Sequence, residues 1–226
     1  MDEQLALFPL NTVLFPTMPL PLHIFEDRYK NMINQCIDTN TPFGVVLIKS
    51  GKEVGGSAKP HNVGTVAQIK RVENVAEGRM NLLVIGERRF RITEITQEQP
   101  ILTADVEFLE PEETDPSELP NKIAEIRGLF WRYLNLILTE APSSEAEKSI
   151  PTTPDSLTFM VASSLQIALS EKQLLLETFN CEEIMDKEIT MLTNLIQELT
   201  KQEKWNDFVS KIAEKRRPPG KEYRHN

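Results

Sequence analysis

The stretch FPLNTVLFPTMPLPLHIFEDRYKNMI, residues 8–33, joins a proline-rich apolar segment to the start of an amphipathic pattern. Its first fourteen residues hold four prolines, Pro9, Pro16, Pro19 and Pro21. Proline fixes φ at about −65° and removes an N–H donor, so such a segment holds an extended shape with few ladder hydrogen bonds. Apolar residues at positions 25, 29, 33 and 37 then recur at helical spacing. The stretch therefore predicts a short strand, a stiff loop and a helix over residues 25–38.

Short apolar segments around this helix predict β-strands. FGVVLIK, residues 43–49, is a continuous apolar run between Pro42 and Ser50-Gly51. VGTVAQIKRVENV, residues 63–75, alternates imperfectly, and ILTADVEFLE, residues 101–110, adds another strand. GRMNLLVIGERRFRITEI, residues 78–95, is expected to break at Gly86 into two strands. Several short strands with turns between them predict a mixed sheet or a small barrel.

The composition changes after Val106. EFLEPEETDPSELP, residues 107–120, has six acidic residues and three prolines and is typical of a solvated linker. Beyond it, apolar residues recur every three or four positions, which predicts helices. We therefore expect an α+β protein with a β-rich lobe over residues 1–113 and an α-helical bundle lobe over 114–205. Residues 206–226 are expected to form a helical end and a basic, disordered tail.

Composition and charge limit the classes of partner. The chain is 40% hydrophobic and 26% charged, which is ordinary for a soluble globular protein, and its net charge is −9. Nucleic acid is an unfavourable partner for such a chain. We expect no membrane partner and a cytoplasmic location, since no apolar run approaches the roughly 18 residues of a membrane span. Cys36 and Cys181 are interpreted as reduced thiols, with a disulfide left open.

Residue patterns that carry chemistry are missing from the sequence. Six residues separate Gly44 from Gly51, where a phosphate-binding P-loop has four, and Glu53 occupies the hydroxyl position of that motif. His23, His61 and His225 lack metal-ligand spacing, and His23 is expected to be a hydrogen-bonded structural residue. No motif marks an activated nucleophile. We predict no catalytic residue, no metal site and no cofactor.

The basic run RRFRI, residues 88–92, has two interpretations. As a strand it directs Phe90 and Ile92 into the core and leaves Arg89 and Arg91 in solvent, where they can pair with Glu107. As a surface patch it would contact RNA. The acidic net charge favours the strand.

Several of these segments together resemble a known family. LFPLNTVLFPTMPLPLHIFEDRYKNMI, FGVVLIKSGKEVGG, VGTVAQI, GRMNLLVIGERRFRI and LTADVEFLE follow one another as in the amino-terminal domain of Lon proteases. LQIALSEKQLLLE, residues 165–177, is similar to a helical stretch of that domain. The resemblance covers residues 3–205 and implies a PUA-like β pseudobarrel followed by an α-helical bundle. Lon continues into an ATPase module and a protease module with a Ser–Lys dyad, and neither has a counterpart in this sequence. The resemblance is to stand-alone Lon-domain proteins of bacteria, and we expect a protein that is not an enzyme.

The resemblance also implies a function, because this domain of Lon helps to recognise substrate polypeptides. We expect a polypeptide-binding module that serves as an adaptor or regulator in protein quality control. Its partners would be unfolded or flexible polypeptide, or a protease complex. An RNA-associated PUA-like module and a hydrolase with an unrecognised dyad remain as alternatives, and the sequence leaves the oligomeric state open.

We place the polypeptide site in the cleft between the two lobes, rimmed by the loop from Leu14 to Leu20. Phe15 is the predicted anchor, because aromatic side chains carry much interface energy. Met18 is the predicted adaptable contact, with Pro19 and Leu20 beside it. Core packing is the competing interpretation for this segment, and within it the side chains expected to be buried are Leu14, Leu22, Ile24 and Phe25.

Overall fold

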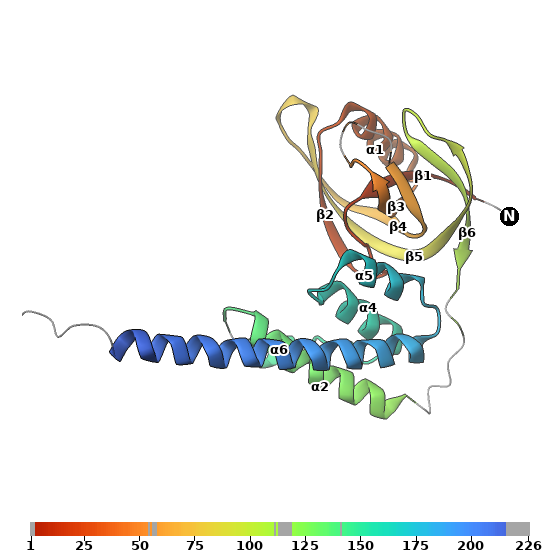
Figure 1. Cartoon of the computed structure of the whole chain (residues 1–226). Coiled ribbons are helices and arrows are strands. Elements are labelled where there is room, and N and C mark those ends of the chain that lie inside the picture. Colours follow the sequence, from red (N-terminus) through yellow and green to blue (C-terminus); the bar gives the residue numbers. More distant parts are fainter. Residues whose placement is uncertain are drawn as a thin grey trace, which may run out of the picture.

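The computed structural model describes residues 3–53, 55, 58–110, 112, 119–140 and 142–215. A β-barrel lobe lies above a group of helices in Figure 1, and the α+β class predicted from the sequence is confirmed. The elements of the barrel lobe are β1 (Glu3–Leu10), β2 (Pro19–Ile24), α1 (Asp27–Thr39), β3 (Phe43–Gly51), β4 (Ala58–Asn74), the 3₁₀ turn η1 (Ala76–Gly78), β5 (Met80–Gln97) and β6 (Leu102–Leu109).

The six strands follow the order β2-β5-β4-β3-β1-β6, and an additional β5–β6 pairing closes the sheet into a barrel. The β1–β3 pairing is parallel, and every other pairing is antiparallel. The Phe90 ring is fully buried inside, over Gly44 and Gly64, where an added Cβ would lie 2.7 Å from the ring. Those two glycines therefore make room for the Phe90 ring.

Helix α1 packs on the barrel through Tyr29, Met32, Ile33 and Cys36. Its start differs from the prediction, since the helix begins at Asp27 and Phe25 precedes it. The Phe25 side chain is 47% exposed, so the expectation that it is buried is wrong. Its ring stacks on His23 instead. Leu14 and Ile24 are buried as expected, and Leu22 is half-buried.

Strand β5 runs continuously across Gly86, so the predicted break at this glycine is wrong. The irregularity appears instead as register shifts in the pairing with β4, one of them between Thr65 and Ala67. A bulge of this kind bends a strand without ending it. The length of β5 allows it to pair with β2 through its first half and with β6 through its second half.

Strand β2 lies at an edge, because its pairing among the described residues is with β5 alone. Pro19 and Pro21 have no N–H to donate, so the ladder to β5 uses the alternate positions Leu20, Leu22 and Ile24. The outer edge of β2 then offers the carbonyl groups of Pro19, Pro21 and His23 but a single N–H, that of His23. The prolines of the opening stretch thus leave an edge that lacks donors.

The second lobe is helical and has a core of its own. The core contains Ile126, Phe130 and Tyr133 from α2 and Leu192 and Ile196 from α6. Its elements are α2 (Pro120–Ile137), α3 (Ser144–Lys148), α4 (Pro154–Ser164), α5 (Leu169–Glu177) and α6 (Cys181–Lys215). Among the described residues, no helix has the length and apolar character needed to cross a membrane.

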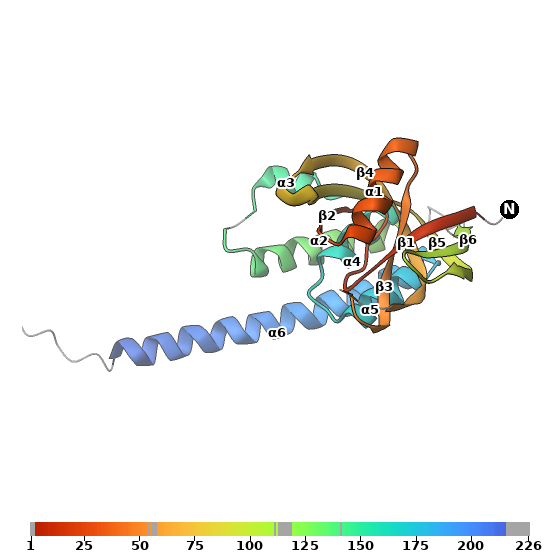
Figure 2. The same ribbon diagram turned by 90° about the horizontal axis from the view of Figure 1, so that it is seen from above.

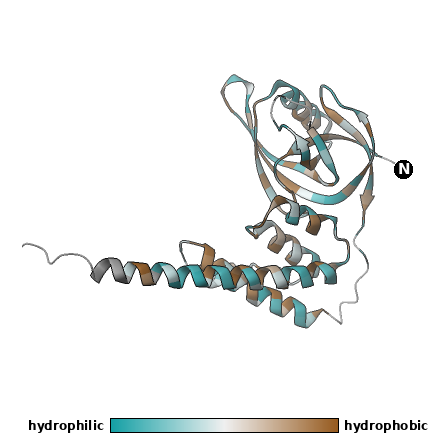
Figure 3. Ribbon diagram, viewed as in Figure 1, coloured by the Kyte–Doolittle hydropathy of each residue, from teal (hydrophilic) through white to brown (hydrophobic). Residues whose placement is uncertain are grey.

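Helix α6 extends well beyond the other helices, as Figure 2 shows. Its first half packs against α2 and α4, and its second half leaves the body of the molecule. In Figure 3 an apolar band interrupts the otherwise polar distal part. The predicted boundary at residue 206 falls within this continuous helix, and the predicted tail lies outside the described residues from 216 onward.

Candidate functional site

The loop between β1 and β2, where the polypeptide site was predicted, is fixed to the barrel. The Thr17 N–H donates to the Gly86 carbonyl over 2.8 Å, and the Gly86 N–H donates to the Met18 carbonyl over 3.0 Å. Thr17 has a φ of 64°, an unfavourable value for a β-branched residue. A Cβ on Gly86 would collide with the Phe15 carbonyl. Glycine at position 86 therefore lets the loop approach β5 closely.

The Phe15 side chain lies between the two lobes and is 1% exposed. It belongs to a cluster that joins the barrel to the helices, and its ring centroid lies 6.3 Å from that of Phe159 in α4. The expectation that Phe15 is an exposed anchor is therefore wrong, because the helical lobe covers it. The other buried members of this junction cluster are Val63, Phe159, Ala162, Leu175, Leu176 and Ile184.

The remaining residues of the predicted site differ in exposure. Met18 is half-buried against the junction cluster, and Leu20 is half-buried against the barrel core. Pro19 is exposed. Their role in binding polypeptide stays a prediction, and this loop is separate from the groove between the lobes described below.

Arg89 ties β5 to the helical lobe. It is 4% exposed, and its guanidinium donates to the carbonyl groups of Leu176 and Thr178 at the end of α5. It also lies over the Phe179 ring, 4.6 Å from the centroid. Burial lowers the pKa of Arg89, and the charge of Asp155 opposes this shift. The expectation that Arg89 faces solvent is wrong, because the lobe that buries it comes almost 90 residues later in the chain.

Phe90 and Arg91 behave as the strand interpretation predicts. Phe90 is fully buried, and Arg91 is exposed with its guanidinium 3.5 Å from the Glu107 carboxylate. Arg88 lies over the Phe108 ring, 3.3 Å from the centroid. The basic run therefore does not form one surface patch, because Arg89 is buried between the lobes and only Arg88 and Arg91 lie on the surface.

A groove of about 510 Å³ lies between the lobes on the side of β3 and β4. The His61 ring lies 3.6 Å from the Glu177 carboxylate, which also accepts a hydrogen bond of 2.8 Å from the Gln173 amide. The same amide donates to the Val63 carbonyl over 3.0 Å. The groove is polar, and its lining residues are Lys49, His61, Asn62, Val63, Arg91, Glu177 and Phe179.

A second groove, of about 520 Å³, lies between α1, β1 and the β5–β6 hairpin. Leu5, Met32 and Ile101 give it an apolar floor, and amide side chains surround them. Two of these, Asn31 and Gln35, are exposed one turn apart on α1. The amides that line this amide groove are Gln4, Asn31, Gln35 and Gln97.

The β1 backbone beside the amide groove is also incompletely paired. Among the described residues, Glu3–Ala6 pair with β6, whereas the pairing with β3 begins at Leu7. One edge of this β1 segment thus has no strand partner in the described part of the chain. Sequence analysis missed the amide groove, because its walls come from segments near residues 4, 31 and 100 that only the fold brings together.

The described residues contain no group of three or more His, Cys, Asp or Glu side chains placed to hold a metal ion. The His23 imidazole hydrogen-bonds to Asn81 over 2.8 Å, which confirms its expected structural role. Cys36 and Cys181 are buried and free. Burial is the main cause that raises the pKa of Cys181 to about 12, so this thiol stays protonated and unreactive.

Glu188 is a fully buried carboxyl group in α6. Neither of its oxygens has a hydrogen-bond partner among the described residues. Burial raises the pKa of this carboxyl well above its usual value. This carboxyl group lies in α6 near Ala162 of α4, and it does not line either of the two grooves described above.

Comparison with known proteins identifies the class of domain that combines this barrel with this helical lobe. Residues 4–194 match the model of the ATP-dependent protease La (LON) substrate-binding domain. The chain belongs to this LON substrate-binding domain family.

Curated relatives of the chain are Lon proteases. It is 30% identical over 215 residues to the Lon protease of Flavobacterium johnsoniae, which covers 92% of this chain and 26% of that protein. It is 26% identical to the Lon protease of Brevibacillus choshinensis over 94% of this chain and 28% of that protein. The chain thus spans about a quarter of the length of these relatives.

Two solved structures share the fold. The Lon N-terminal domain protein from Xanthomonas campestris matches with a TM-score of 0.64 and 21% identity, over 83% of this chain and 98% of that one. The N-terminal domain of the Lon protease from the Mycobacterium avium complex matches with a TM-score of 0.66 and 20% identity, over 84% of this chain and 98% of that one.

Proposed function

We propose that this chain is a non-enzymatic module that binds unfolded or flexible polypeptide in the cytoplasm. In this proposal it delivers such polypeptide to a protease complex or regulates that complex. Membership of the LON substrate-binding domain family supports the ligand class. The amide groove is the observation on which the proposed location of the binding site rests.

The chemistry of the amide groove suits polypeptide of varied sequence. An amide side chain both donates and accepts, so Asn31 and Gln35 can pair with the N–H and C=O groups that every peptide has. The apolar floor of Leu5, Met32 and Ile101 can cover apolar side chains without selecting one shape. The unpaired edge of β1 adds backbone groups, which is how extended peptides join a sheet.

Affinity for unfolded polypeptide tests the proposal. Fluorescence polarisation would follow a labelled, permanently unfolded protein and a set of apolar peptides titrated with the full chain. The Asn31→Ala, Gln35→Ala double variant should weaken binding by about tenfold, or about 1.4 kcal/mol, since each lost hydrogen bond contributes about 0.5–1.5 kcal/mol. Asn34→Ala, Asp38→Ala is the matched control, because both are exposed on α1 with the same spacing but outside the groove.

A third variant, Met18→Ser with Pro19→Ala, separates the amide groove from the loop predicted from the sequence. If the loop variant alone weakens binding, polypeptide binds at the loop and the groove assignment is wrong. Affinity weaker than about millimolar for every polypeptide in the set would contradict the proposed function itself, since it corresponds to only about 4 kcal/mol.

A further inference from the structure

The distal half of α6, residues 201–215, carries a cluster of apolar side chains that nothing in the described chain covers. Trp205 is 63% exposed, Phe208 53% and Val209 45%. The two aromatic rings lie 5.9 Å apart, so the cluster is contiguous. At 1.5 Å per residue, this distal segment is about 22 Å long.

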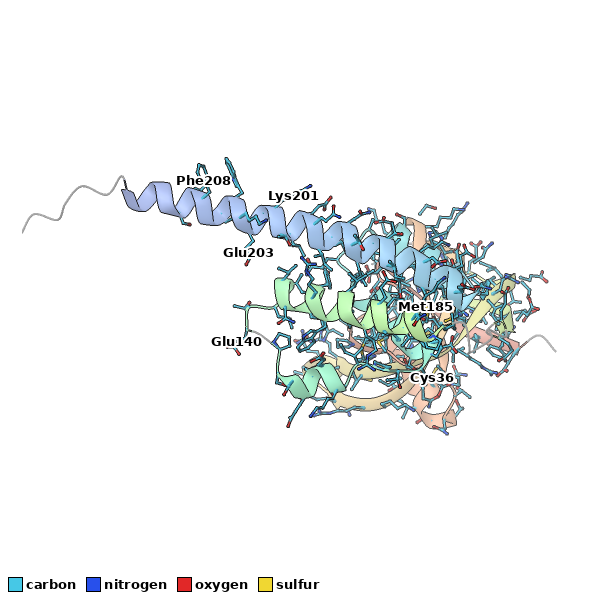
Figure 4. The ribbon with its side chains drawn as sticks, turned by 90° about the horizontal axis from the view of Figure 1, so that it is seen from below. Cys36, Glu140, Met185, Lys201, Glu203 and Phe208 are labelled. Atoms are coloured by element: carbon cyan, nitrogen blue, oxygen red, sulfur yellow. The ribbon has the colours of Figure 1, made fainter. Side chains whose placement is uncertain are left out.

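The apolar side of the distal segment faces away from the molecule. At about 100° per residue, Phe208 lies about 120–160° around the helix from the buried residues Leu192 and Ile196. Figure 4 shows Phe208 and Lys201 on the outer side of α6 and Glu203 on the side toward the body. The chain therefore cannot cover these side chains with its own lobes while α6 stays a continuous helix. A flat surface along the outer side of α6 could contact these apolar side chains without a steric clash with the two lobes.

Charges are ordered around the same segment. Lys201 and Lys204 lie within about 40° of Phe208 on the helix, whereas Glu203 lies about 140° away. Residues 201–226 hold eight Lys or Arg and four Asp or Glu, while residues 1–200 hold 17 and 30. The sequence from residue 201 onward therefore has a formal charge of +4, whereas residues 1–200 have a formal charge of −13.

The size of the cluster argues against a second copy of the chain as the partner. A fully exposed aromatic side chain presents about 150–250 Å², so Trp205, Phe208 and Val209 offer on the order of 300 Å² per copy. A stable protein interface buries about 800 Å² per partner. In antiparallel pairing, moreover, the lysine side of one helix would meet the lysine side of the other.

We propose that the distal segment of α6 binds an anionic lipid surface, with Trp205, Phe208 and Val209 in the interface and the lysines among the lipid headgroups. Helices that lie in a bilayer interface combine exposed aromatic residues with lysines, as Trp205 and Phe208 are combined here with Lys201 and Lys204. The acidic body does not prevent this, because the segment is longer than the Debye length of about 8 Å at physiological salt. This proposal departs from the expectation of no membrane partner, which rested on the lack of a membrane-spanning run and took no account of a helix that lies in the interface.

Vesicle binding tests the proposal with a fluorophore that the chain already has. The sequence has two tryptophans, so Trp131→Phe leaves Trp205 as the sole tryptophan, which can be excited apart from the tyrosines. Sedimentation and emission spectra would be recorded with vesicles of phosphatidylcholine alone and of phosphatidylcholine with phosphatidylglycerol. We expect binding and a blue shift of Trp205 emission with the anionic vesicles only, and weaker binding in high salt.

Matched variants assign the binding to the segment. Trp205→Gln, Phe208→Gln in the wild-type chain should weaken sedimentation with anionic vesicles at least about tenfold, while Lys201→Glu, Lys204→Glu should weaken it through charge. Leu138→Ser, Leu174→Ser is the control, because these side chains are 45% and 50% exposed elsewhere on the helical lobe. Circular dichroism would establish that each variant keeps its helix content.

Two results would overturn the proposal. One is equal or absent binding to the neutral and anionic vesicles by the folded wild-type chain. The other is a dimer in analytical ultracentrifugation that the glutamine variant abolishes, which would assign the apolar cluster to a second copy. Peptide affinity plays no part in either measurement, so this proposal and the proposed function can fail separately.

Discussion

Glu188 illustrates how a single side chain sets a pH dependence. The unfolded chain releases the Glu188 proton above about pH 4.3, whereas the folded chain keeps it up to its raised pKa. The folded state then binds the proton more tightly across that interval. The free energy of unfolding therefore falls as pH rises from about 4.3 through the folded pKa of Glu188.

Replacement of the Glu188 carboxyl by an apolar side chain should remove this fall in the free energy of unfolding at high pH. We expect Glu188→Met to raise the free energy of unfolding at pH 8 by about 1–3 kcal/mol, the cost of a buried polar group without a partner. The gain should shrink toward pH 5. Thermal unfolding at a series of pH values measures both effects. Glu183→Gln, on the exposed side of the same helix, should keep the wild-type dependence, and an unchanged slope in Glu188→Met would contradict the assignment.

At the level of elements, the loop between β1 and β2 acts as a wedge between the lobes. Its backbone is held by Gly86, and its Phe15 ring fills the space between Val63 of β4 and Phe159 of α4. The prolines limit the motion of this loop, and the loop holds the Phe15 side chain in the junction cluster. Packing at the junction depends on that ring.

Phe15→Ala should lower the free energy of unfolding by about 3–5 kcal/mol, as truncation of a buried phenylalanine does. The melting temperature should fall by roughly 2–4 °C for each kcal/mol in a chain of this size. Pro19→Ala, at the exposed first position of β2, should lower the free energy of unfolding by no more than about 1 kcal/mol. Calorimetry of the two variants would measure this, and near-native stability of Phe15→Ala would return Phe15 to the role of a surface contact.

On the scale of the molecule, the junction cluster and Arg89 join two lobes that each have a separate core. A fragment of residues 1–113 should keep the barrel and give a mainly β circular dichroism spectrum, since α1 is its one long helix among the described residues. It should be less stable to urea than the full chain, because Phe15 and Val63 lose their cover and Arg89 loses two carbonyl partners. A mainly helical spectrum, or equal stability, would contradict this account.

The sequence predicted those parts of the fold that depend on neighbouring residues. The apolar spacing of Tyr29 and Ile33 located α1. The linker predicted over residues 107–120 begins within β6 and ends at the start of α2, and its residues 111 and 113–118 lie outside the described residues. The spacing could not fix where α1 begins, and Phe25 stacks on His23 outside the helix instead of entering the core. The spacing of apolar residues predicts that a helix is present more reliably than it predicts where the helix begins and ends.

Contacts between distant segments were beyond such patterns. Gly86 looks like a strand break, yet its role is to let Phe15 approach β5. Arg89 occupies a solvent position in the strand pattern, and α5 buries it. The amide groove likewise needs α1, β1 and the β5–β6 hairpin to be in place. Each of these features depends on which surfaces meet, and a local sequence pattern does not record that.

Under the proposed function, the proline edge of β2 has a consequence, because the protein would meet unfolded chains. Unfolded polypeptides tend to add strands to any sheet edge that can pair with them, and such additions grow into aggregates. Along β2, Pro19 and Pro21 offer carbonyl groups without the matching donors, so an incoming strand finds half of its bonds missing. Strand addition at β2 is therefore unfavourable even when unfolded polypeptide is abundant. Polypeptide binding would then be confined to surfaces from which it can dissociate.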